Sequence, residues 1–124
     1  MEKVYTKNAP DAIGPYSQGL RAGNMVFVSG QIPVNPATGE RAQGIEAQAT
    51  QALTNLKNVL AAAGLTTKNV IKTSVFLADL KDFPTVNGIY ETFFESPYPA
   101  RSCVQVAGIP KGALVEIECI AVEE

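Results

Sequence analysis

Apolar and polar residues recur along the chain with two different periods, and these periods predict four strands and two helices. A spacing of three and four residues runs from Ile45 to Ala63 as one apolar helical stripe, and Gly64 favours a helix end because glycine adopts the left-handed conformation. A second helix is expected from Asp82, which can cap its first turn, with Pro84 where helices tolerate proline. Strand-like segments cover residues 17–21, 25–29, 70–77 and 114–122.

The order of these elements, β-β-α-β-α-β, indicates one domain over residues 1–124. Gly23 and Asn24 separate the first two strands and predict a tight hairpin, since both residues tolerate positive φ angles. The loop over residues 33–44 carries Asn-Pro and Thr-Gly turn signals. We therefore expect an α+β fold in which both helices pack on one face of a mixed sheet.

Neither face of the last predicted strand is properly polar. Because side chains alternate along a strand, one face presents Val115, Ile117, Cys119 and Ala121, and the other presents Leu114, Glu116, Glu118, Ile120 and Val122. The preceding strand likewise presents on one face Ile71, Thr73, Val75 and Leu77. If the helices cover one face of the sheet, the other keeps an apolar patch too large for a monomer, so we expect an oligomer that buries it.

The charge balance argues against nucleic acid and membrane partners. Ten Lys and Arg residues against twelve Asp and Glu residues leave a net charge of −2, and neither sign forms a run. A phosphate backbone or an anionic membrane is therefore only weakly attracted. No apolar stretch reaches the ~20 residues of a bilayer span, and the first residues lack the apolar core of a signal peptide. We expect a cytoplasmic protein.

The chain contains no histidine and only two cysteines, Cys103 and Cys119. Two cysteines are too few for a disulfide framework or a zinc site, and both lie in strand-like apolar sequence, where reduced thiols are common. Without histidine, Ser–His and Cys–His nucleophiles and histidine–metal centres are excluded. Acid–base chemistry must therefore use carboxylates, tyrosine, lysine or water, and no metal site is expected.

Arg101 is the only charged residue between Glu95 and Lys111. A guanidinium stays protonated in proteins, so one set among apolar and proline residues needs an anion. That anion is either a ligand carboxylate held in a bidentate clamp or a protein carboxylate across a subunit interface. The nearest acidic candidates downstream are Glu116 and Glu118. The pattern suggests a site for a small anionic substrate.

Glu116 and Glu118 lie two residues apart on one face of an apolar strand. A carboxylate in such surroundings tends to have a raised pKa and can then exchange protons with a substrate or a water molecule. Either residue could equally be a partner in an interfacial ion pair, and the spacing does not distinguish between them.

Five further residues are candidates for lining a binding site: Tyr16, Ser29, Gly30, Asn87 and Cys103. Asn87 places an amide on the aromatic face of the second helix, where it could point into a pocket or bond to a neighbouring loop. Tyr16 follows a Gly-Pro turn and Ser29-Gly30 ends a strand, positions that often present polar groups to ligands. Cys103 should face the same side as Arg101, but without a histidine it is a poor nucleophile and is expected only to line the pocket.

Five segments, in order, resemble the Rid (YjgF) family and in particular its RidA-type imine deaminases. They are Ala12-Ile-Gly-Pro-Tyr-Ser-Gln18, Val28-Ser-Gly-Gln-Ile-Pro33, Val86-Asn87, Pro99-Ala-Arg-Ser-Cys-Val104 and Val115-Glu-Ile-Glu-Cys-Ile-Ala-Val122. The resemblance spans almost the whole chain, and the Arg-Ser-Cys segment is its most specific part. It implies a chorismate-mutase-like homotrimer with a central barrel, helices outside and a pocket at each subunit interface.

The resemblance also implies hydrolysis of enamines and imines, such as 2-aminoacrylate and 2-iminobutanoate, to 2-keto acids and ammonia. Pyridoxal-phosphate-dependent dehydratases release such intermediates, whereas the deaminase itself would need no cofactor. If the family's roles are carried over to this chain, Arg101 would clamp the substrate carboxylate, and Glu116, not Glu118, would activate the water. The pocket would be lined by Tyr16, Ser29, Gly30, Asn87 and Cys103. The segment between Phe94 and Pro99 is shorter than in some members, which bears on the pocket rim and the substrate range.

Two other functions remain open for a protein with this resemblance. One is a metabolite-binding or regulatory trimer without turnover, which is typical of relatives that lack the arginine. The other is a ribonuclease or translation inhibitor, as older family names suggest, although the chain has no basic stripe to hold RNA.

Overall fold

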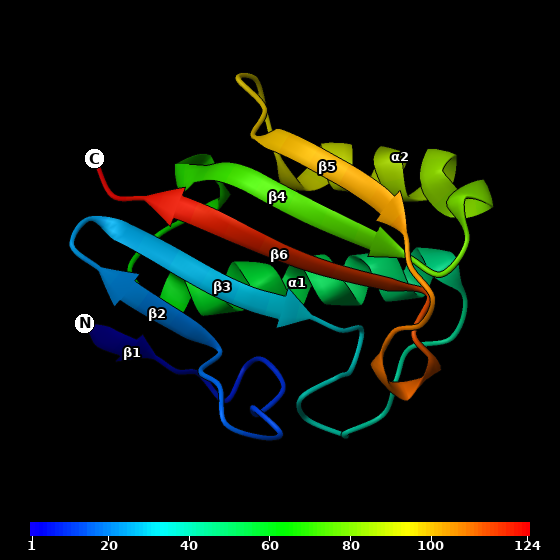
Figure 1. Cartoon of the computed structure of the whole chain (residues 1–124), viewed down its shortest axis with the longest axis horizontal. Helices are drawn as coiled ribbons and strands as arrows, with labels where there is room; N and C mark the ends of the chain where they lie inside the picture. Colours follow the sequence, from blue (N-terminus) through cyan, green and yellow to red (C-terminus); the bar gives the residue numbers. More distant parts are fainter.

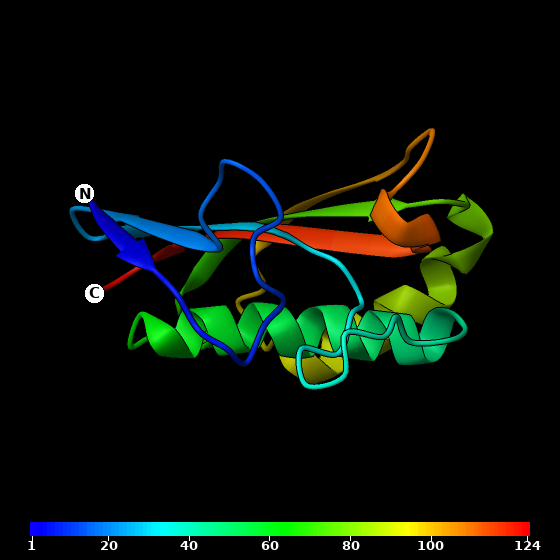
Figure 2. The same ribbon diagram turned by 90° about the horizontal axis from the view of Figure 1, so that it is seen from below.

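One six-stranded sheet with two helices makes up the protein in the computed structural model, which describes residues 1–124 (Figure 1). The strands are β1 (Glu2–Val4), β2 (Gly19–Ala22), β3 (Met25–Gln31), β4 (Val70–Leu77), β5 (Ala100–Gln105) and β6 (Val115–Val122). The helices are α1 (Ile45–Ala62) and α2 (Phe83–Phe93), and 3-10 turns lie at Thr67–Asn69, Leu80–Asp82 and Pro110–Gly112. Both helices pack on the same face of the sheet, so the predicted α+β class is confirmed (Figure 2).

The strands lie in the order β1-β2-β3-β6-β4-β5, and only β4 and β5 run parallel to each other. The last strand of the chain, β6, therefore lies inside the sheet between β3 and β4. Both strands that the pattern did not predict, β1 and β5, are edge strands. β1 has three residues and β5 has no buried residue, so neither shows the apolar alternation by which a strand is predicted.

Helix α1 crosses the covered face of the sheet and contributes most of the core. Its apolar stripe has no exposed surface at Ala49, Ala52, Leu53, Leu56, Val59 and Leu60. The helix ends just before Gly64, whose φ of 77° is the left-handed conformation that the sequence predicted there. Neither α1 nor α2 is long and apolar enough to cross a lipid bilayer.

The alternation predicted for β6 is confirmed, because Val115, Ile117, Cys119 and Ala121 are all buried in the core beneath the helices. For β4 the prediction for Ile71 is wrong. The register against β6 shifts between Val70 and Lys72, so Ile71 is the extra residue of a bulge and is 48% exposed, while Thr73 and the following alternate residues are buried.

The predicted cap of the second helix is also wrong. Asp82 makes no capping hydrogen bond, because it is the last residue of a 3-10 turn that runs directly into α2, and its backbone is already helical. Asp79 caps that turn instead, with Oδ1 accepting a 2.9 Å hydrogen bond from the backbone N–H of Lys81. Pro84 lies in the first turn of α2, as predicted.

Candidate functional site

Arg101 lies on β5 with its side chain on the face of the sheet that α2 covers. It is the register partner of buried Thr73 on β4, and its Nη1 donates a 2.8 Å hydrogen bond to Oδ1 of Asn87. The guanidinium carbon lies 4.8 Å from the ring centre of Tyr90 and 5.4 Å from that of Phe83. None of the ion pairs of the chain includes Arg101, so its charge contacts only an amide and two ring faces.

A depression of about 490 Å³ opens beside the guanidinium. Its lining residues are Asn87, Tyr90, Glu91, Tyr98, Pro99 and Arg101. A small carboxylate has room to approach the free N–H donors of Arg101 from this side. The two conditions for an anion clamp, an unpaired cation and an adjacent cleft, are therefore met.

Glu116 lies on β6 with its side chain on the opposite, uncovered face. Its neighbours Val115 and Ile117 have no exposed surface under the helices, so the alternation of the strand directs Glu116 away from them. Partial burial, with a smaller contribution from Glu118, raises the pKa of the Glu116 carboxyl above its ordinary value of 4.5. A Cβ atom at Gly30 would lie 2.6 Å from Oε2 of Glu116, so any larger residue there would require the carboxyl to move from this position.

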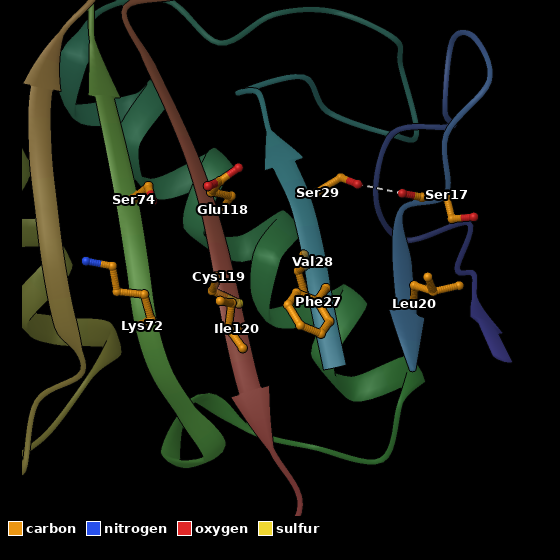
Figure 3. Close-up of a pocket in the computed structure, with 10 residues that line it drawn as sticks. All are labelled: Ser17, Leu20, Phe27, Val28, Ser29, Lys72, Ser74, Glu118, Cys119 and Ile120. Atoms are coloured by element: carbon orange, nitrogen blue, oxygen red, sulfur yellow. Dashed lines mark hydrogen bonds between the residues drawn. The ribbon is translucent and has the colours of Figure 1, made fainter. Parts of the chain in front are cut away.

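Glu118 shares the uncovered face but has different surroundings. It is exposed and lies in a depression of about 400 Å³ between β3 and β4 (Figure 3). The other lining residues are Ser17, Leu20, Phe27, Val28, Ser29, Lys72, Ser74, Cys119 and Ile120. The contact with Gly30 therefore separates two glutamates that their spacing alone could not distinguish.

The remaining candidates lie in different parts of the chain. Tyr16 is about half exposed and lines a depression of about 250 Å³, which is also lined by Gly30 and Lys111. Ser29 lies on the uncovered face and its hydroxyl donates a 2.6 Å hydrogen bond to the carbonyl of Ser17. Cys103 packs against the core on the same face as Arg101, as predicted, and burial raises the pKa of its thiol, which keeps it protonated.

The predicted site residues thus form two groups on opposite faces of the sheet. Arg101, Asn87 and Cys103 lie on the face of α2, whereas Glu116 lies on the face that no helix covers. Arg101 lines one of the three depressions described above, and Glu116 lines none of them. A single chain therefore does not bring the two predicted catalytic residues together.

Sequence reasoning missed the contribution of two aromatic residues. Phe83 and Tyr90 belong to the aromatic helical face on which the sequence placed Asn87, and both rings contact the guanidinium of Arg101. The available signal was their position on the same helical face as Asn87, three and four residues away. That spacing shows that the three side chains share one face of the helix, but it does not show that this face contacts Arg101.

The chain is similar to known proteins in both sequence and fold. A sequence profile described as Endoribonuclease L-PSP matches residues 6–123. The 2-iminobutanoate/2-iminopropanoate deaminase of Escherichia coli K12 is 55% identical over 122 residues, which cover 96% of this chain and 95% of that protein. The crystal structure of E. coli TdcF with bound serine has a TM-score of 0.96 at 50% identity and covers 100% of both chains.

RidA from an Antarctic Psychrobacter species is a further solved relative. Its TM-score is 0.97 at 43% identity, and the match covers 99% of this chain and 100% of that one. Sequence and fold therefore agree along the whole length. The chain belongs to the endoribonuclease L-PSP family, which is also named the YjgF or Rid family.

Proposed function

We propose that this protein hydrolyses small 2-imino acids and their enamine tautomers, such as 2-iminobutanoate, 2-iminopropanoate and 2-aminoacrylate, to 2-keto acids and ammonia. The observation that carries the proposal is Arg101, which has no carboxylate partner within the chain and borders an open depression. The deaminase relative at 55% identity supports it. The serine bound to TdcF also supports it, because serine has the carboxylate and α-nitrogen of such a substrate.

The reaction needs only a carboxylate that transfers protons and a cation that holds the substrate. A protonated 2-imino acid has an electrophilic carbon, and water adds to it once a base accepts a proton from that water. The resulting carbinolamine then loses ammonia and leaves the keto acid, and an enamine enters the same route after protonation at its terminal carbon. Arg101 would hold the carboxylate and Glu116 would take and return the proton. Tyr16, Ser29, Gly30, Asn87 and Cys103 would line the pocket.

The proposal includes a homotrimer whose sites form between subunits. The uncovered face exposes 42% of Phe27 and leaves Leu20 and Ile120 partly exposed, which is an apolar surface suited to packing on another copy. Because Arg101 and Glu116 lie on opposite faces of one chain, an Arg101 clamp and a Glu116 base can meet only if Glu116 of the partner subunit completes the site. A closed ring of three subunits would bury the apolar surface of each sheet and would bring Arg101 of one subunit to Glu116 of the partner subunit.

The activity is tested with imines generated in place. Freshly formed 2-iminobutanoate is supplied by an amino acid oxidase acting on 2-aminobutanoate, and 2-oxobutanoate is followed over the uncatalysed hydrolysis. The proposal expects the protein to accelerate keto-acid formation in proportion to its concentration. Binding without acceleration would instead favour the metabolite-binding trimer.

The shared site is tested by mixing two inactive variants, Arg101→Ala and Glu116→Ala, and reassembling the trimers after mild denaturation. In random trimers of equal parts, about one site in four combines an intact Arg101 with an intact Glu116 from the next subunit. Activity should therefore return to roughly a quarter of wild type. If both residues acted from one chain, every site would lack one of them and no activity would return.

Gly30→Ala should lower the turnover number by displacing Glu116. A Cβ atom at residue 30 would lie 2.6 Å from Oε2 and 2.8 Å from Cδ of Glu116, so the carboxyl must move. We expect kcat to fall by roughly tenfold or more, since a displacement of about 1 Å can cost 10²-fold. Gly88→Ala is the matched control, because a Cβ there meets nothing within 4 Å. Equal loss in both variants would argue against a role for the Glu116 position.

The pH dependence should shift when Glu118 loses its charge. Glu116 must be ionised to accept a proton, and burial together with Glu118 raises its pKa above 4.5, so kcat/KM should fall with decreasing pH at a midpoint above 4.5. Glu118→Gln removes the smaller of the two causes and should move this midpoint to lower pH while leaving most activity. An unchanged or raised midpoint would contradict the assignment of the proton acceptor.

The cellular setting belongs to the same proposal. Pyridoxal-phosphate-dependent serine and threonine dehydratases would supply the substrates in the cytoplasm, and the protein would act without a cofactor of its own. The two cysteines are unpaired, which fits a reducing compartment. No feature of the site favours RNA cleavage, because the depression beside Arg101 contains one cation and Glu91.

A further inference from the structure

Helix α2 presents three side chains to Arg101 at a spacing of four and three residues. Phe83 and Tyr90 turn their ring faces to the guanidinium, and Asn87 accepts a hydrogen bond from Nη1 between them. All three contacts come from one helical face, so their relative positions are fixed by the helix itself. The guanidinium is thereby held in one plane before any ligand arrives.

The three contacts are electrically suited to a clamp. A carboxylate partner would neutralise Arg101 and compete with an anionic ligand, whereas ring faces and an amide orient the cation and leave its charge in place. Asn87 occupies a donor of Nη1, and the remaining N–H groups are free for a bidentate contact. The plane of the rings then decides the direction in which the free donors point.

Tyr90 is the fixed member of this set. Its side chain is buried, its hydroxyl lies 2.8 Å from Oγ1 of Thr73, and its ring lies 4.5 Å from that of Phe94. Thr73 is the register partner of Arg101 across β4 and β5. Thr73 therefore lies beside Arg101 in the sheet and also anchors the Tyr90 ring that contacts the guanidinium.

We propose that Tyr90, anchored by Thr73, is a positioning residue that sets the plane of the Arg101 guanidinium and so determines the affinity of the site for the substrate carboxylate. This inference rests on the proposed function, since Arg101 is taken as the carboxylate clamp. Tyr90 acts through Arg101 and takes no part in proton transfer. Its loss should therefore raise KM far more than it lowers kcat.

The test measures two quantities in each variant: the Kd of 2-oxobutanoate by calorimetry, and KM and kcat with 2-iminobutanoate. Tyr90→Leu removes the ring face and should weaken binding and raise KM by roughly fivefold to tenfold, with kcat within about twofold of wild type. Tyr90→Phe keeps the ring but loses the hydroxyl that bonds to Thr73, so it should raise KM less than Tyr90→Leu does. Thr73→Val keeps the ring but removes its anchor, and should give a smaller rise in KM.

Phe94→Leu is the matched control, because Phe94 packs on Tyr90 but contributes no ring face to Arg101. The inference is overturned if Phe94→Leu raises KM as much as Tyr90→Leu, or if Tyr90→Leu leaves Kd unchanged or lowers only kcat. If Tyr90→Leu does not fold, Tyr90→Phe and Thr73→Val provide the test, because each removes the hydrogen bond between Tyr90 and Thr73. A wild-type KM in both variants overturns the inference. The binding arm needs no turnover, so absence of deaminase activity would refute the proposed function and leave this test valid.

Discussion

Arg101→Ala should lower kcat/KM for 2-iminobutanoate by roughly 10²- to 10³-fold, corresponding to about 3–4 kcal/mol of lost transition-state stabilisation. Arg101 forms no ion pair within the chain, so the variant leaves no protein carboxylate without a partner. The lost free energy is therefore that of the contact between Arg101 and the substrate carboxylate. Affinity for 2-oxobutanoate, measured by calorimetry, should decrease together with the rate of keto-acid formation.

Two further variants make this result specific. Arg101→Lys keeps the charge but loses the planar fork and its stacking on Tyr90, so it should recover only a small part of the activity. Arg21→Ala removes an arginine from β2 that bonds to Glu123 and the carbonyl of Ala63, and should leave kcat/KM near wild type. Full activity in Arg101→Ala, in a folded protein, would refute the clamp.

The predicted site residues lie on two faces of the sheet, and this connects the fold to the proposed mechanism. The helices cover one face and supply the ring faces and amide around Arg101, while the uncovered face supplies Glu116 beside an apolar surface. In the proposed trimer, the contact that buries this surface would also complete the site. Assembly and catalysis would then depend on each other, and an isolated subunit would be inactive.

Much of this arrangement could be predicted from the sequence. The stripe of α1 and the alternation of β6 follow from burial on one face, and both were read correctly because one face of each element enters the core. Arg101 stood out because it is isolated among uncharged residues, and the structure gives it no carboxylate partner. Asn87 stood out as an amide on an aromatic helical face, and it bonds to Arg101.

Other features depend on contacts between distant segments. β5 is an edge strand without buried residues, so its pattern could not show that Arg101 lies on the face opposite to Glu116. The bulge at Ile71 arises from the register between two strands, which no local pattern encodes. The spacing of Glu116 and Glu118 could not show that their surroundings differ, because Gly30, whose missing side chain leaves room for the Glu116 carboxyl, lies on another strand.

Glu116→Gln should lower kcat by roughly 10²- to 10³-fold while leaving KM within about threefold of wild type, because general acid–base catalysis contributes at this scale. The amide fills the same space beside Gly30 but cannot accept a proton from water. Binding of 2-oxobutanoate through Arg101 should persist. Single-turnover measurement of keto-acid formation, with calorimetry on the same sample, separates the two effects.

The pH profile distinguishes proton transfer from a purely structural effect. In wild type the rate should decline with acid as Glu116, whose pKa is raised by burial and by Glu118, becomes protonated. In Glu116→Gln that decline should disappear from the residual rate, whereas Glu118→Gln should retain it at lower pH. A Glu116→Gln variant with wild-type kcat would show that another group activates the water. A Glu118→Gln variant that loses as much activity would show that the two glutamates act together.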